Sequence, residues 1–149
     1  MEYAIGVLIS ISVATLAKSS GMDRDRSFYP TVLIVVASYY SLFAAMGASR
    51  AVLAVETAAD LGFATLAIIG FKRNLWMVAA AIAGHGLFDV VHHWFVENPG
   101  VPVWWPGFCA TVDIGLGGWV ALRLWKTPAS FAPRISQSAT GAVAGRSSR

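Results

Sequence analysis

The stretch GHGLFDVVHH, at positions 84–93, places three histidines and an aspartate inside an otherwise apolar run. At 100° per residue of an α-helix, His85, Asp89 and His92 fall within an arc of about 60°, with His93 just beside it. Imidazole nitrogens and carboxylate oxygens together suit Zn²⁺, Fe²⁺ or Mn²⁺. The stretch therefore indicates a metal site, although its spacing is not a diagnostic signature of one metalloenzyme class.

Further acids that could complete such a site lie in two other apolar runs. Glu56 and Asp60 are four residues apart, so they are neighbours on one face of a helix. Asp113 follows Cys109 at the same spacing. Because Cys109 is the sole cysteine, the chain has no intrachain disulfide, and we expect this side chain to be a small packing residue.

The composition places these groups in a membrane protein. Of the 149 residues, 56% are hydrophobic and 13% are charged, and the mean hydropathy is +0.62. A membrane span needs about 20 residues to cross a hydrocarbon core about 30 Å thick, so the length allows four to six spans. We predict an all-α bundle of five transmembrane helices within residues 1–126, at about 3–17, 30–49, 51–70, 75–96 and 103–125.

Lysine and arginine predict the orientation, because cytoplasmic loops hold them preferentially. With the amino terminus outside, the inner segments hold three basic residues in 18–26, two at 72–73 and five from Arg123 onward. Only Arg50 of the 11 then faces outward. This topology accounts for the net charge of +3, so no nucleic-acid partner is expected. Residues 127–149, rich in small residues, are predicted to form a disordered cytoplasmic tail.

The ionisable groups of three predicted helices also lie at similar depths. At 1.5 Å per residue from the outer ends, the depths are about 8 Å for Glu56, 14 Å for Asp60, 10 Å for Asp89, 16 Å for His85 and 15 Å for Asp113. Charges facing lipid are costly, so these groups are expected to face one another. Neither lysine nor arginine is predicted at this depth, which leaves protons, imidazolium ions or a metal to balance the carboxylates.

The favoured hypothesis is an intramembrane metal site. Its expected ligands are His85, Asp89, His92 and Asp60, holding zinc, iron or manganese. Asp113 and Glu56 are then the carboxylates that move a proton in catalysis. The expected activity is metal-dependent hydrolysis of a lipid or small amphiphile. The expected location is the cell membrane, as a multi-pass protein of the inner membrane if the source is a bacterium, with the lipid bilayer as partner.

Two alternatives stay open at this point. The polar cluster could be a hydrogen-bonded network that only fixes helix packing, with His93 in solvent contact. Tyr39 and Tyr40 could donate phenolic hydroxyls to the site, although packing is the favoured role for both. Alternatively, the chain could be a proton- or cation-coupled carrier, since intramembrane acids and histidines also relay protons. The near absence of ionisable residues in the inner halves of the predicted helices disfavours a carrier.

The segment FDVVHHWFVENPGVPVWWPGFCATVDIGLG, residues 88–117, resembles a family of small uncharacterised bacterial integral membrane proteins. A D-x-x-H-H helix, an N-P turn and a later Cys and Asp recur in that family. The resemblance implies a multi-pass membrane protein of unassigned activity. A looser similarity links the chain to ceramidase-type membrane hydrolases, whose zinc site uses three histidines and an aspartate. This sequence lacks their paired H-x-x-x-H on a late helix and has fewer spans, so this similarity is only an analogy.

Overall fold

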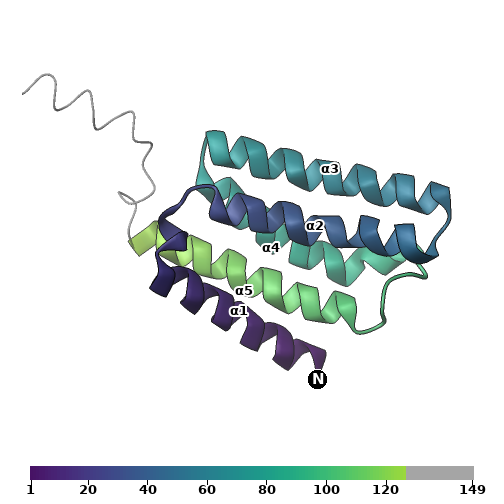
Figure 1. The fold of residues 1–149 in the computed structure, drawn as a ribbon, viewed down its shortest axis with the longest axis horizontal. Helices are drawn as coiled ribbons and strands as arrows, with labels where there is room; N and C mark the ends of the chain where they lie inside the picture. Colours follow the sequence, from purple (N-terminus) through teal and green to yellow (C-terminus); the bar gives the residue numbers. More distant parts are fainter. Residues whose placement is uncertain (127–149) are drawn as a thin grey trace, which may run out of the picture.

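The computed structural model describes residues 1–126, which form five long helices with consecutive helices running in opposite directions (Figure 1). Two short 3₁₀ turns, η1 (Met22–Arg24) and η2 (His92–Trp94), accompany them. The predicted tail, 127–149, lies outside the described residues. The helices are α1 (Glu2–Ser20), α2 (Phe28–Gly47), α3 (Arg50–Lys72), α4 (Leu75–Val91) and α5 (Trp105–Lys126).

Each of these stretches is long and apolar enough to cross a membrane, counting α4 together with η2. This confirms the expected all-α arrangement of five span-length helices. The fourth differs in detail from the predicted 75–96, because α-helical geometry ends at Val91 and a 3₁₀ turn follows. Further along the chain, Pro99 disfavours helical geometry at Asn98, the residue before it, so the helix does not resume there.

Capping residues set the tight connections between neighbouring helices. The Ser49 side chain accepts a hydrogen bond from the Val52 N–H at 3.3 Å, and Asn74 accepts one from the Trp76 N–H at 3.0 Å. Both satisfy N–H groups that the first turn of a helix leaves unpaired. Because only residues 48–49 and 73–74 separate these helices, α3 must pack antiparallel to both α2 and α4.

Two glycines allow α4 and α5 to pack with their backbones close together. A Cβ atom at Gly86 would lie 2.9 Å from the Ala110 carbonyl oxygen, and one at Gly117 would lie 2.8 Å from the Ala83 nitrogen. Small residues at such crossings let two helices approach where larger side chains would hold them apart. This close approach brings the polar face of α4 against α5.

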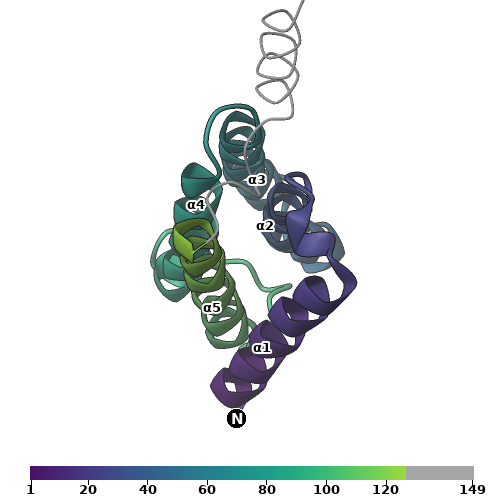
Figure 2. The same ribbon diagram turned by 90° about the vertical axis from the view of Figure 1, so that its left-hand side faces the viewer.

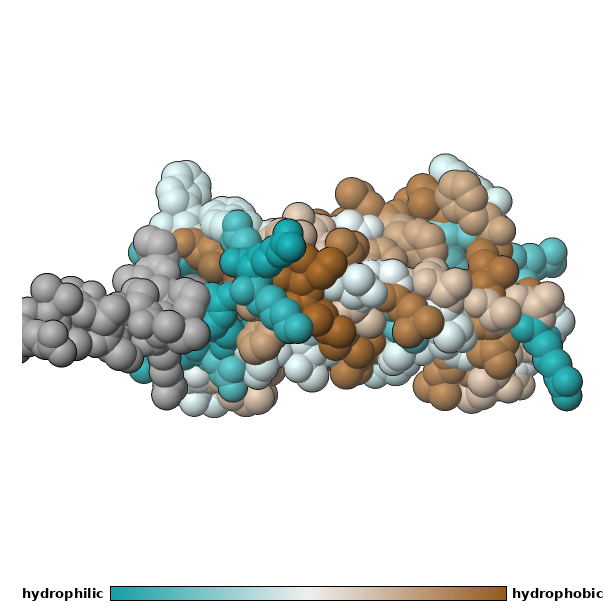
Figure 3. Space-filling view, turned by 90° about the horizontal axis from the view of Figure 1, so that it is seen from above, coloured by the Kyte–Doolittle hydropathy of each residue, from teal (hydrophilic) through white to brown (hydrophobic). Residues whose placement is uncertain are grey.

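The surface of the bundle is apolar along its length and charged toward its ends (Figure 3). On α3, Val55 and Leu61 are more than half exposed, and few residues of this helix are buried. Exposed tryptophans also lie near the ends, with Trp94 and Trp104 near one and Trp76 and Trp125 near the other. Apolar flanks with aromatic residues at both ends are typical of helices that face lipid.

Candidate metal centre

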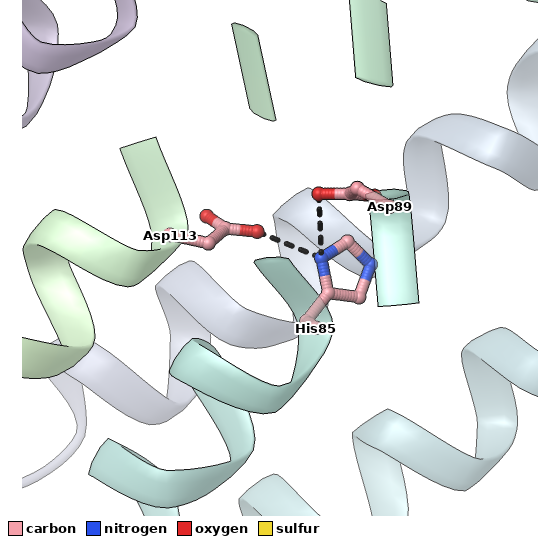
Figure 4. A group of neighbouring side chains, drawn as sticks. All are labelled: His85, Asp89 and Asp113. Carbon is pink, nitrogen blue, oxygen red and sulfur yellow. Dashed lines mark hydrogen bonds and ion pairs between the residues drawn. The ribbon is translucent and has the colours of Figure 1, made fainter. Parts of the chain in front are cut away.

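Three side chains from α4 and α5 converge in the interior of the bundle (Figure 4). His85 Nδ1 lies 2.7 Å from Asp113 Oδ2 and 3.6 Å from Asp89 Oδ2. One ligand atom from each residue lies within 4.8 Å of the other two. His85 is 1% exposed, and Asp89 and Asp113 are 0% exposed. An imidazole and two carboxylates therefore share one site that is closed to solvent.

The carboxylates of this group are not satisfied by hydrogen bonds. Within residues 1–126, neither oxygen of Asp89 has a hydrogen-bond partner, and neither does Oδ1 of Asp113. Burying an ionised carboxylate without compensation costs several kcal/mol, on the order of the whole stability of a small protein. A protonated His85 supplies a single positive charge to two acids. A further proton or a cation is therefore needed to balance the group.

The spacing of the ligand atoms is compatible with a metal ion. In a tetrahedral centre with metal–ligand bonds of about 2.0–2.2 Å, the ligand atoms lie about 3.3–3.6 Å apart. The distance between His85 and Asp89 matches that value, whereas the distance between His85 and Asp113 is that of a hydrogen bond. If a cation took the place of the proton between His85 and Asp113, the distance between their ligand atoms would have to increase by less than about 1 Å. Three protein ligands leave a fourth position open, as in catalytic zinc sites.

A second polar cluster joins α3 to the connection after α4. Both carboxylate oxygens of Glu56 lie 3.0 Å from His92 Nε2. Asn98 donates from Nδ2 to Glu56 at 2.8 Å and to the Tyr40 carbonyl oxygen at 3.2 Å. Glu56 is 1% exposed, so this buried carboxylate, unlike Asp89, has its oxygens paired. The cluster fastens the 95–104 connection to α2 and α3.

Tyr40 of α2 contacts both clusters. Its ring stacks on the His92 imidazole, with the ring centroids 4.0 Å apart and the planes at 25°. Its hydroxyl is buried beside the Asp89 carboxylate and interacts with it as a hydrogen-bond donor, although the geometry falls short of a full hydrogen bond. The expected packing role of Tyr40 therefore comes with a phenolic O–H directed at an acid of the α4–α5 group.

The structure divides the residues predicted for one site between these two places. His85 and Asp89, both expected as ligands, lie together with Asp113, which was expected to move a proton. His92, also expected as a ligand, lies instead with Glu56. Asp60 is half-buried, accepts a hydrogen bond from Ser41 at 3.4 Å, and interacts electrostatically with His85.

Some neighbouring side chains were expected and others were not. His93 is exposed and Cys109 is buried, as expected. The Tyr40 hydroxyl lies beside Asp89, as the alternative of a phenolic donor to the site allowed, whereas the contacts of Asn98 were not expected. The Asn-Pro pair marked a turn in the sequence, but nothing in it indicated that the amide reaches Glu56.

No family model, curated protein or solved structure matches the chain. The class of protein therefore follows from the fold and the site. Residues 1–126 form an all-α structure with five helices that could span a membrane and a buried group of one histidine and two aspartates compatible with a metal ion.

Proposed function

We propose that this chain is an integral membrane protein that binds one divalent transition metal ion, zinc, iron or manganese, through His85, Asp89 and Asp113. The observation that carries this proposal is the state of Asp89. Its carboxylate is fully buried, receives no hydrogen bond of full geometry within residues 1–126, and has as polar neighbours the Tyr40 hydroxyl and the His85 imidazole, the latter 3.6 Å away. A metal ion would neutralise both acids and fill their empty lone-pair positions.

The contrast with Glu56 favours a metal over a network that only fixes packing. A structural network gains stability when each polar atom is paired, because a half-satisfied network is worse than an apolar core. Glu56 fits that description, since His92 and Asn98 supply donors to it. Asp89 differs, because neither of its oxygens receives a hydrogen bond of full geometry within residues 1–126. We therefore assign the structural role to the cluster around Glu56 and the metal to the group around His85.

The proposed reaction is metal-assisted hydrolysis of a lipid or small amphiphile. A bound divalent ion supplies Lewis acidity, which polarises a carbonyl or phosphoryl oxygen and makes a coordinated water a stronger acid. His85, Asp89 and Asp113 would hold the ion in place. The Tyr40 hydroxyl, which lies beside Asp89, would donate a hydrogen bond to a substrate oxygen. Within residues 1–126, no observation supports a proton- or cation-coupled carrier as directly as the buried group of His85, Asp89 and Asp113 supports a metal site.

The proposed location is the cell membrane, with the amino terminus outside and the chain after α5 in the cytoplasm. The positions of the basic residues support this orientation. The 95–104 connection would then lie at the outer face, and the metal centre would lie in the outer half of the bilayer.

Metal analysis of the detergent-purified protein tests the proposal, comparing wild type with Asp89→Asn and with Asp60→Asn as the matched control. We expect near-stoichiometric metal in wild type and in Asp60→Asn, and little in Asp89→Asn. After chelation, Asp89→Asn should be at least as stable to heat as wild type, because one of the two buried acids is removed while Asp113 still pairs with His85 and the amide oxygen can still accept from Tyr40.

Two results would contradict the proposal. One is well-folded wild-type protein that takes up none of Zn²⁺, Fe²⁺ and Mn²⁺ after chelation and reloading. The other is metal-free Asp89→Asn that unfolds well below metal-free wild type, since this would give Asp89 a packing role.

A further inference from the structure

An apolar cleft of about 790 Å³ lies between α1, α2 and α5. In the end-on view of Figure 2, α1 crosses from beside α5 toward α2. The residues that line the cleft come from these three helices and from the residues that directly precede α1 and α5, the latter being Trp104. Ile5 and Ile9 are about half exposed, so the cleft opens to the side of the bundle and is not enclosed. Its wall includes Ile5, Ile9, Val13, Val36, Phe108 and Val112.

The cleft reaches the candidate metal centre. Asp113, which bonds His85 on one side, also forms part of the cleft wall, and its Oδ1 atom has no hydrogen-bond partner among residues 1–126. Apart from Asp113 and Glu2, the side chains of the wall are not acidic or basic. A molecule in the cleft would therefore meet apolar side chains along its length and, at one point, the wall formed by Asp113, whose carboxylate is buried behind that wall.

The dimensions of the cleft indicate what can fill it. On α5 the wall runs from Trp105 to Leu116, which corresponds to about 16 Å along the helix axis. This is about half of a hydrocarbon core about 30 Å thick, the depth of one leaflet. Spread over that length, 790 Å³ gives a mean cross-section of about 50 Å².

An apolar cleft that opens toward lipid is expected to be filled. An unfilled space deprives its wall atoms of dispersion contacts on one side. Lipid tails are as apolar as the wall, so a tail enters the cleft without a desolvation cost. A flexible alkyl chain is thinner than a helix and lies parallel to α1, α2 and α5, as lipid tails do in a bilayer.

We propose that the cleft binds an alkyl chain of a membrane lipid and presents that lipid to the centre at Asp113. This inference rests on the proposed function, because the lipid meets a reactive group only if the protein lies in a membrane and binds metal at His85, Asp89 and Asp113. The substrate would then be a membrane amphiphile that is recognised by its alkyl chain, and this alkyl chain would enter from the side between α1 and α2.

Photolabelling tests the proposal in vesicles of phosphatidylcholine that carries a diazirine on one acyl chain, with labelled peptides mapped by mass spectrometry. In wild type we expect labelling to concentrate on the segments containing Ile9, Val36 and Val112. Val36→Trp fills the cleft and should reduce their labelling to the level of the exposed face of α3. Val55→Trp, the same change at an exposed position of α3, should leave the labelling of the cleft segments unchanged.

Metal content separates the two proposals. Val36→Trp should keep the metal content of wild type, and Asp89→Asn should keep the cleft labelling. Folded wild type whose cleft segments are labelled no more than α3 would overturn this inference, even with metal present. Cleft labelling that remains in Val36→Trp would also overturn it, and Val36→Phe replaces this variant if the tryptophan prevents folding. Cross-links from the cleft to a second copy of the chain would overturn it as well. Cleft labelling without metal in wild type would overturn the metal centre alone.

Discussion

His85 Nδ1 lies 2.7 Å from Asp113 Oδ2, and this contact joins α4 to α5 between side chains 28 positions apart. It forms beside a close approach of the two backbones, because Gly86, the next residue, leaves no side chain between the helices. A Cβ atom at Gly86 would lie 3.1 Å from the Asp113 Cβ atom. The metal centre therefore depends on a glycine that supplies no ligand.

Gly86→Ala should weaken both the fold and the site. The added methyl group meets the Ala110 carbonyl oxygen, so α4 and α5 must shift apart, at a cost of about 1–3 kcal/mol. Metal affinity should fall with it, because His85 and Asp113 are held on opposite sides of the shifted crossing. Thermal unfolding in detergent and metal titration measure the two effects.

Gly84→Ala is the matched control for that substitution. It lies on the same helix, two residues earlier, and a Cβ atom there has no atom of another residue within 4 Å in the described structure. Alanine is a better helix former than glycine by up to about 1 kcal/mol, so this variant should be neutral or more stable. Equal losses in the two variants would show that the helix crossing at Gly86 is not what positions the site.

Asn98→Ala should loosen the 95–104 connection without releasing metal. The substitution removes the donor to Glu56 and to the Tyr40 carbonyl oxygen, and the acceptor for the Gly100 N–H. Leaving such groups unpaired costs about 1–3 kcal/mol. Hydrogen–deuterium exchange should therefore increase in this connection.

Glu97→Ala serves as the neighbouring control, since Glu97 is exposed and surface changes usually stay within about 0.5 kcal/mol. Loss of metal from Asn98→Ala at unchanged stability would link the His92–Glu56 cluster to the metal. It would thereby restore His92 as a ligand.

The proposed orientation predicts which cysteines a membrane-impermeant maleimide reaches on intact cells. In a Cys109→Ala background, Glu97→Cys should be labelled from outside, and Ser19→Cys only after the membrane is permeabilised. Both positions are exposed and near helix ends, on opposite sides of the proposed bilayer. The reverse pattern would invert the topology, and labelling of both on intact cells would contradict a span through α1.

The sequence by itself determined the number and approximate extent of the helices. Hydropathy and helical periodicity are local properties, so they can be read from consecutive residues. It also predicted that His85, Asp89 and Asp113 lie at one level, because depth along a helix depends only on the rise per residue. The spacing of His85 and Asp89 placed both on one face of α4.

Only the tertiary structure decided which histidine meets which carboxylate. The rotation of each helix about its axis is set by packing, here by the close crossing at Gly86 and Gly117. The end of α4 at Val91 also mattered, because His92 lies in a 3₁₀ turn, where 100° per residue no longer holds. His92 therefore pairs with Glu56 of α3, while His85 pairs with Asp113 of α5. Contacts between residues so far apart in the chain leave no trace in the local pattern.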